Sequence, residues 1–99
     1  MFLSRLFGRR RLASTFVSVG DQIKQLNDTK QFRKAIALFD AHVKEKQPST
    51  LSINQALKAC IELGDLKRAM DIHRSLSPQM VKNGFIRYNL IRLYCLLFN

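Results

Sequence analysis

The sequence predicts an all-α fold, specifically an α-solenoid of helix-turn-helix repeats with a 34-residue period. Apolar residues recur at intervals of three and four along most of the chain, which is the spacing of a helix face, and no segment alternates as a strand would. The chain also matches itself in residue class when it is shifted by 34 residues. Such a period is typical of stacked helix pairs.

The internal match extends without a gap through two successive shifts. The first shift pairs Ile23 with Leu57, Lys24 with Lys58, Phe32 with Leu66, Ala35 with Ala69, and Leu38 with Ile72. The second shift continues from Leu57 to Ile91, from Lys58 to Arg92 and from Cys60 to Tyr94. We therefore expect repeat 1 at residues 17–50, repeat 2 at 51–84, and the first helix of an incomplete repeat 3 at 85–99.

Each repeat is expected to contain two helices joined by a short turn. In repeat 1, a first helix with Ile23 and Leu26 should end at the polar residues 27–30. A second helix should then begin at Phe32 and continue until Pro48 stops it.

Repeat 2 carries clearer signals at its helix ends. Thr50 and Ser52 are candidate N-caps for its first helix, and Gly64 suits the left-handed position that follows a helix. Asp65 should cap the second helix, which we expect to end near residues 77–78. A connector containing Asn83 then leads into the final helix.

Length and charge restrict the possible functions. The 99 residues are enough for one small domain, which excludes a large multidomain enzyme. The net charge of +10 favours a polyanionic partner such as nucleic acid or an acidic membrane surface. The longest apolar run, residues 93–98, is too short to span a membrane, because a span needs about 20 such residues.

The first 16 residues are typical of a mitochondrial presequence. They are rich in arginine, contain no acidic residue, and place Phe2, Leu3, Leu6 and Phe7 at helical spacing. We expect the segment to direct the protein to the mitochondrial matrix and to be removed between residues 13 and 17. The alternatives are a basic surface arm and an arm that binds acidic lipid.

No pattern predicts a metal, a cofactor or a catalytic centre. Cys60 and Cys95 do not form a CxxC pair, and His42 and His73 lack the spacing of metal ligands. The chain contains no glycine-rich phosphate loop, HExxH motif or nucleophile elbow, so we expect it not to be an enzyme. The cysteines are expected to be core residues.

Repeat 2 resembles the pentatricopeptide repeat family, in its long-motif variety, over the stretch LKACIELGDLKRAMDIH at 57–73. The stretch NLIRLY at 89–94 is similar to the start of a following repeat. Repeat 1 is a weaker match because Lys30 stands where the family usually has glycine. The tetratricopeptide pattern fits less well, since neither first helix contains its Leu-Gly step.

The resemblance implies an organellar protein that binds single-stranded RNA along a face made by the first helices, and that takes part in RNA processing, stability or translation. In the family, the position that Asp21, Gln55 and Asn89 occupy reads the edge of a base. A second position, here Thr50 and Gly84, is commonly Asp, Asn or Ser, so we predict no target sequence.

A basic row accompanies the polar row. Lys24, Lys58 and Arg92 follow the polar residues by three positions, so they share a helix face with them and could contact RNA phosphates. Both rows could instead be the solvated face of the first helices. The alternative function is a tetratricopeptide-like adaptor in mitochondria that captures peptide carboxylates through the same three cations.

The last helix is apolar on nearly every side. Leu93, Leu97 and Phe98 are expected to be exposed because the second helix that would cover them is missing from the sequence. We expect the chain to be a truncated form of a longer repeat protein and to self-associate. Pairing with another protein chain through this helix, or with a larger assembly, is the alternative.

Overall fold

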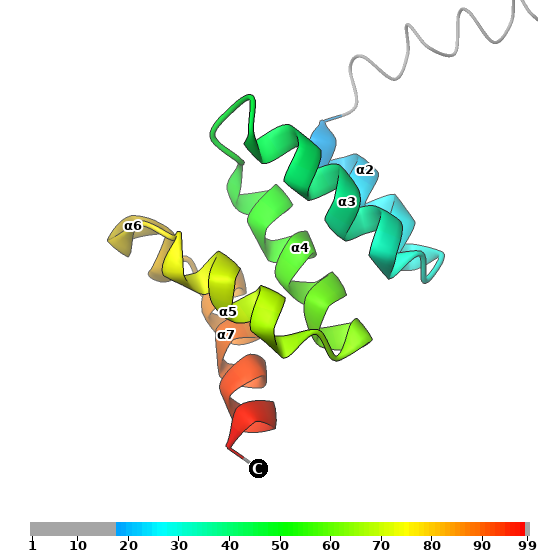
Figure 1. The fold of residues 1–99 in the computed structure, drawn as a ribbon. Helices are drawn as coiled ribbons and strands as arrows, with labels where there is room; N and C mark the ends of the chain where they lie inside the picture. The colour runs from blue at the N-terminus through cyan, green and yellow to red at the C-terminus, as the bar shows by residue number, and fades with distance from the viewer. Residues whose placement is uncertain (1–17, 99) are drawn as a thin grey trace, which may run out of the picture.

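The computed structural model describes residues 18–98, which form six helices and no strand (Figure 1). The helices are α2 (Val19–Asp28), α3 (Phe32–Val43), α4 (Thr50–Leu63), α5 (Leu66–Arg74), α6 (Pro78–Val81) and α7 (Gly84–Leu97). The predicted all-α class is therefore confirmed for this range. The predicted presequence lies outside the described residues.

Helix α4 is the centre of the fold. It packs against α2 and α3 on one side and against α5 and α7 on the other, as Figure 1 shows. Its buried apolar residues are Ile53, Ala56, Leu57, Ala59, Cys60 and Ile61. Each large apolar side chain that is removed from water stabilises the fold by about 1.5–3 kcal/mol, so this helix supplies much of the core.

Helix α2 approaches α4 closely because one of its contact residues is a glycine. A Cβ atom at Gly20 would lie 2.7 Å from Cγ of Leu51, which is closer than such atoms can approach. Ile23, one turn further along α2, is fully buried in the common core. The small residue therefore lets Ile23 reach the interior.

The turn between α4 and α5 has the geometry that the sequence predicts. Gly64 adopts a left-handed conformation with φ of 79°. Its N–H donates to the carbonyl of Ile61 at 3.1 Å, and the N–H of Asp65 donates to the carbonyl of Cys60 at 2.9 Å. Asp65 then caps α5, because its carboxylate accepts a hydrogen bond from the N–H of Arg68.

The turn between α2 and α3 repeats this arrangement with a lysine in place of the glycine. Lys30 has φ of 62°, and its N–H donates to the carbonyl of Asn27 at 2.9 Å. The N–H of Gln31 donates to the carbonyl of Leu26 at 2.8 Å. The turn therefore imposes a left-handed backbone on a residue that has a Cβ atom.

Two predicted helix ends differ from the structure. Ser49 caps α4 through its hydroxyl, so Thr50 and Ser52, the predicted caps, both lie within the helix. Helix α5 ends at Arg74, earlier than predicted, because Pro78 begins the separate short helix α6. A proline at the first position of a helix loses no hydrogen bond, which makes it a favourable start.

Within residues 18–98, helix α7 is covered on one face only. Ile86, Leu90 and Leu93 are buried, and Tyr94 also contacts α5, where its hydroxyl lies 2.6 Å from Nδ1 of His73. The prediction that Leu93 is exposed is therefore wrong. The large apolar side chains that α7 and its C-cap leave exposed are Phe85, Tyr88, Ile91, Leu96, Leu97 and Phe98.

None of the helices within residues 18–98 combines the length and the apolar character that crossing a bilayer requires.

Replacing Lys30 with glycine should stabilise the protein. A left-handed residue with a side chain costs about 1–2 kcal/mol, and the extra chain entropy of glycine offsets part of this, so a gain of about 0.5–1 kcal/mol is expected. Urea unfolding of Lys30→Gly measures it. Lys44→Gly is the control, because Lys44 has φ of −73° and should gain nothing. Equal or lower stability of Lys30→Gly would contradict the strained turn.

Only one of the two thiols should react while the protein is folded. Burial and the nearby Asp65 carboxylate raise the pKa of Cys60 from 9.0 to about 12, whereas Cys95 is exposed. At pH 8 the Cys60 thiol therefore stays protonated and inert. Ellman's reagent should modify one thiol rapidly and the second only in denaturant, and Cys95→Ser should abolish the rapid phase. Two rapid phases would show that the core around Cys60 is open.

Candidate nucleic-acid interface

A groove of about 480 Å³ lies where α2, α4 and the N-terminal end of α7 meet. Its lining residues are Lys24, Thr50, Leu51, Asn54, Gln55, Asn83 and Phe85. The groove brings together two of the residues that the sequence assigns to RNA contact, Lys24 and Gln55. The other four, Asp21, Lys58, Asn89 and Arg92, do not line it.

Gln55 is oriented by an amide from the neighbouring helix α2. Nδ2 of Asn27 donates at 2.9 Å to Oε1 of Gln55 and, at the same distance, to its backbone carbonyl. Gln55 is 8% exposed and Asn27 is buried. This contact occupies the oxygen of the Gln55 amide, whose Nε2 forms no hydrogen bond with any described residue.

Asn54 is held in the same way from the opposite side. Nδ2 of Asn89, which belongs to α7, donates to Oδ1 of Asn54 and, at 3.3 Å, to its backbone carbonyl. Asn89 is 4% exposed, and its Oδ1 accepts from Nη1 of Arg92 at 3.2 Å. Asn89 therefore lies behind Asn54, and it is Asn54 that reaches the groove.

Asp21 has a local structural contact near the start of α2. Its carboxylate accepts a hydrogen bond from the hydroxyl of Ser18 at 2.8 Å, and its backbone N–H donates to the same hydroxyl at 3.1 Å. A carboxylate in the first turn also interacts favourably with the helix dipole. These contacts are enough to explain an aspartate at this position.

The three cations of the basic row differ in their partners. Lys24 pairs with Asp28 at 3.0 Å, and Arg92 pairs with Glu62 at 3.0 Å. Lys58 is half-buried and forms no ion pair within residues 18–98. Exposed pairs of this kind contribute about 0–1 kcal/mol, so a phosphate could replace the carboxylates at little cost.

Three residues of this region escaped the sequence analysis: Asn27, Asn54 and Phe85. Asn27 follows Gly20 and Ile23 on the buried face of α2, and a polar residue on an apolar face is a detectable signal. Phe85 stands three residues before Tyr88, away from the buried face of α7. Asn54 gave no signal, because its role depends on a contact with α7.

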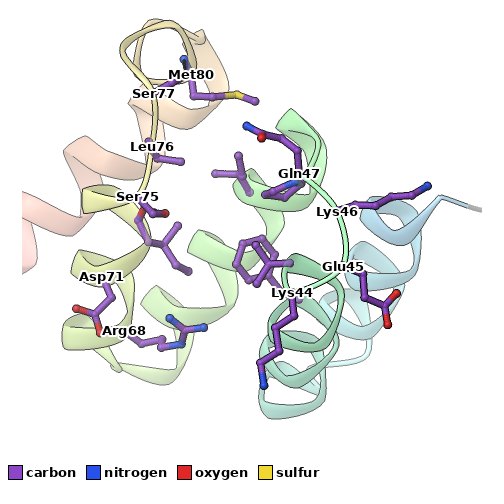
Figure 2. Close-up of a pocket in the computed structure, with 15 residues that line it drawn as sticks. Lys44, Glu45, Lys46, Gln47, Arg68, Asp71, Ser75, Leu76, Ser77 and Met80 are labelled. Carbon is purple, nitrogen blue, oxygen red and sulfur yellow. Dashed lines mark hydrogen bonds between the residues drawn. The ribbon is translucent and has the colours of Figure 1, made fainter.

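A second groove, of about 540 Å³, lies between α3, residues 44–48, α5 and α6 (Figure 2). Figure 2 shows Arg68 and Asp71 on one wall and Lys44 on the other, with the side chain of Lys46 pointing away from the space between them. Arg68 pairs with Asp40 of α3. None of the residues predicted to contact RNA lines this groove, so it is the weaker candidate.

The described residues hold no group of three or more histidine, cysteine or acidic side chains that could bind a metal ion. Comparison with protein-family models, with characterised proteins and with solved structures finds no match. The case for a function therefore rests on the chain's own residues and contacts.

Removing the amide that holds Gln55 should destabilise the contact between α2 and α4. Asn27→Ala leaves a buried acceptor without its donor, and we expect a loss of about 1–2 kcal/mol in unfolding free energy. Gln25→Ala, an exposed change in the same helix, is the control and should be nearly neutral. Equal effects of the two substitutions in urea unfolding would argue against this contact.

Proposed function

We propose that this protein is a pentatricopeptide-like solenoid of the mitochondrial matrix that binds single-stranded RNA and takes part in RNA processing, stability or translation. The observation that carries the proposal is the groove where α2, α4 and α7 meet, which Asn54 and Gln55 line beside Lys24. Within residues 18–98, neither Nε2 of Gln55 nor Nδ2 of Asn54 forms a hydrogen bond.

The repeat period has support from the helix ends. Lys30 and Gly64 are 34 residues apart and are the two residues with positive φ among the described residues. The hydrogen bonds that close the two turns are also the same, at positions shifted by 34. In this proposal α2, α4 and α7 are the first helices of successive repeats, and α3 and α5 are the second helices.

Amide groups fixed in this way suit the edges of unpaired bases. Every base carries acceptor atoms on its edge, and a side-chain amide nitrogen can donate to them. The neighbouring amides of Asn27 and Asn89 occupy the oxygens, so the nitrogens are the groups left for a ligand. Gln55 keeps the role that the sequence assigns to it, while Asn89 acts through Asn54.

The cations supply the sequence-independent part of binding. Lys24 lines the groove, and Arg92 bridges α7 and α4 through Glu62. Lys58 lies on α4 and is half-buried. Base contacts contribute about 1–3 kcal/mol each, so two or three repeats should bind RNA with roughly millimolar to micromolar affinity. Because the three cations would contact phosphates, the affinity for RNA should also fall as the salt concentration rises.

Replacing Lys24, Lys58 and Arg92 together with alanine should weaken RNA binding. We expect the slope of log K against log salt to fall by about 2, because three phosphate contacts are lost. The measurement is fluorescence anisotropy of the full chain with an oligouridine of about 20 nucleotides, between about 50 and 200 mM salt. A duplex of the same length serves as the competitor.

The matched control replaces Lys44, Lys46 and Lys67 with alanine; all three are exposed and form no ion pair with another residue of 18–98. It changes the net charge by the same amount and should preserve most of the slope. If both triple variants lose equal affinity, or if the native chain does not prefer the single strand, the RNA proposal fails. Binding of a peptide carboxylate that depends on Lys24, Lys58 and Arg92 would then favour the adaptor function.

A further inference from the structure

The proposed RNA-binding groove continues onto an aromatic surface of α7 that the polar and basic rows do not include. Phe85 is 74% exposed and Tyr88 is 63% exposed. They are three residues apart in one helix, so they lie on neighbouring positions of its surface. Phe85 also lines the groove beside Lys24, Asn54 and Gln55, which makes the aromatic surface continuous with it.

A cation lies over the ring of Tyr88. The guanidinium carbon of Arg92 lies 5.9 Å from the centre of the Tyr88 ring. Hydrogen bonds to Oδ1 of Asn89 and to the carboxylate of Glu62 hold that guanidinium in position.

The chemistry of this surface selects one kind of occupant. A second copy of the chain, placed face to face here, would bring Arg92 beside Tyr88 against the same arginine of that copy. A polyanion that also offers flat apolar faces is attracted by both features. Unpaired bases have such faces, whereas the bases of a duplex are already stacked on their neighbours.

We propose that Phe85 and Tyr88 form a stacking platform for an unpaired nucleobase at the α7 edge of the groove. The platform rests on the proposed RNA-binding function and adds a contact that is independent of base identity, because every base has a π face. The edge of a neighbouring base would meet the amides of Asn54 and Gln55, and its phosphate would meet Arg92. The exposed aliphatic residues Leu96 and Leu97, near the other end of α7, are not part of it.

Substitution of each ring by leucine tests the platform in the full chain. Phe85→Leu and Tyr88→Leu keep an apolar side chain at an exposed position but remove the π face. Each should weaken binding of oligouridine by about five-fold or more, with an unchanged salt slope because no phosphate contact is lost. Tyr88→Phe, which keeps the ring, should bind as the native chain does.

Two controls separate stacking from other effects. Phe98 follows the last residue of α7, and its exposed ring stacks on Tyr94. Phe98→Leu removes this ring and should leave the binding of oligouridine unchanged. A strand of abasic phosphodiester units offers the same charges without bases. The native chain should bind this abasic strand more weakly than oligouridine. Phe85→Leu and Tyr88→Leu should bind the abasic strand with the same affinity as the native chain.

Tyrosine emission provides a direct signal, because the sequence contains two tyrosines and no tryptophan. In a Tyr94→Phe chain the emission comes from Tyr88 alone, and stacking on a base should quench it. Quenching should saturate at the oligouridine concentration at which anisotropy saturates. Unchanged emission at saturation would overturn the platform.

The outcomes distinguish the two proposals. If the native chain binds oligouridine with the expected salt slope but both leucine variants bind equally well, the platform is wrong and the RNA-binding function stands. If the leucine variants lose affinity for duplex or abasic strands to the same extent, the platform is also wrong. If the native chain does not bind single-stranded RNA, both proposals fail.

Discussion

The burial of α4 on two opposite sides is the constraint on which the rest of this structure depends. The pair α2 and α3 and the later helices α5 and α7 meet mainly through α4, where Leu57 and Cys60 are fully buried. A direct link between the two groups is the ion pair of Arg68 with Asp40. The groove beside Lys24 also depends on α4, because Thr50, Leu51, Asn54 and Gln55 of that helix line it.

Polar contacts at the two edges of α4 determine how the neighbouring helices are aligned. Asn27 from α2 and Asn89 from α7 each donate to a side-chain oxygen and to a backbone carbonyl of α4. A shift of either helix by one turn would leave these buried amides unpaired, which costs more than the hydrogen bonds themselves contribute. The same bonds orient Gln55 and Asn54, so helix alignment and the geometry of the groove are coupled.

Sequence reasoning succeeded where the determining chemistry is local. Gly64 and Asp65 were assigned correctly because a left-handed glycine and a capping carboxylate act within one turn of a helix. Sequence reasoning failed where contact with a neighbouring helix determines whether a side chain is buried. The 34-residue match aligns Ile91 with buried Leu57, yet Ile91 is 60% exposed, because no helix covers that side of α7 within the described residues.

The ion pairs beside the groove bear on how a ligand could bind there. Asp28 and Glu62 neutralise Lys24 and Arg92 in the free protein, which limits the attraction of any polyanion that offers charge alone. A single strand that also places a base against the amides gains a contact that charge cannot supply. RNA phosphates would then replace Asp28 and Glu62 as partners of Lys24 and Arg92 chiefly when the bases of the same strand also contact the groove. In the proposed function, the paired cations therefore favour selectivity for unpaired strands over tight binding of every polyanion.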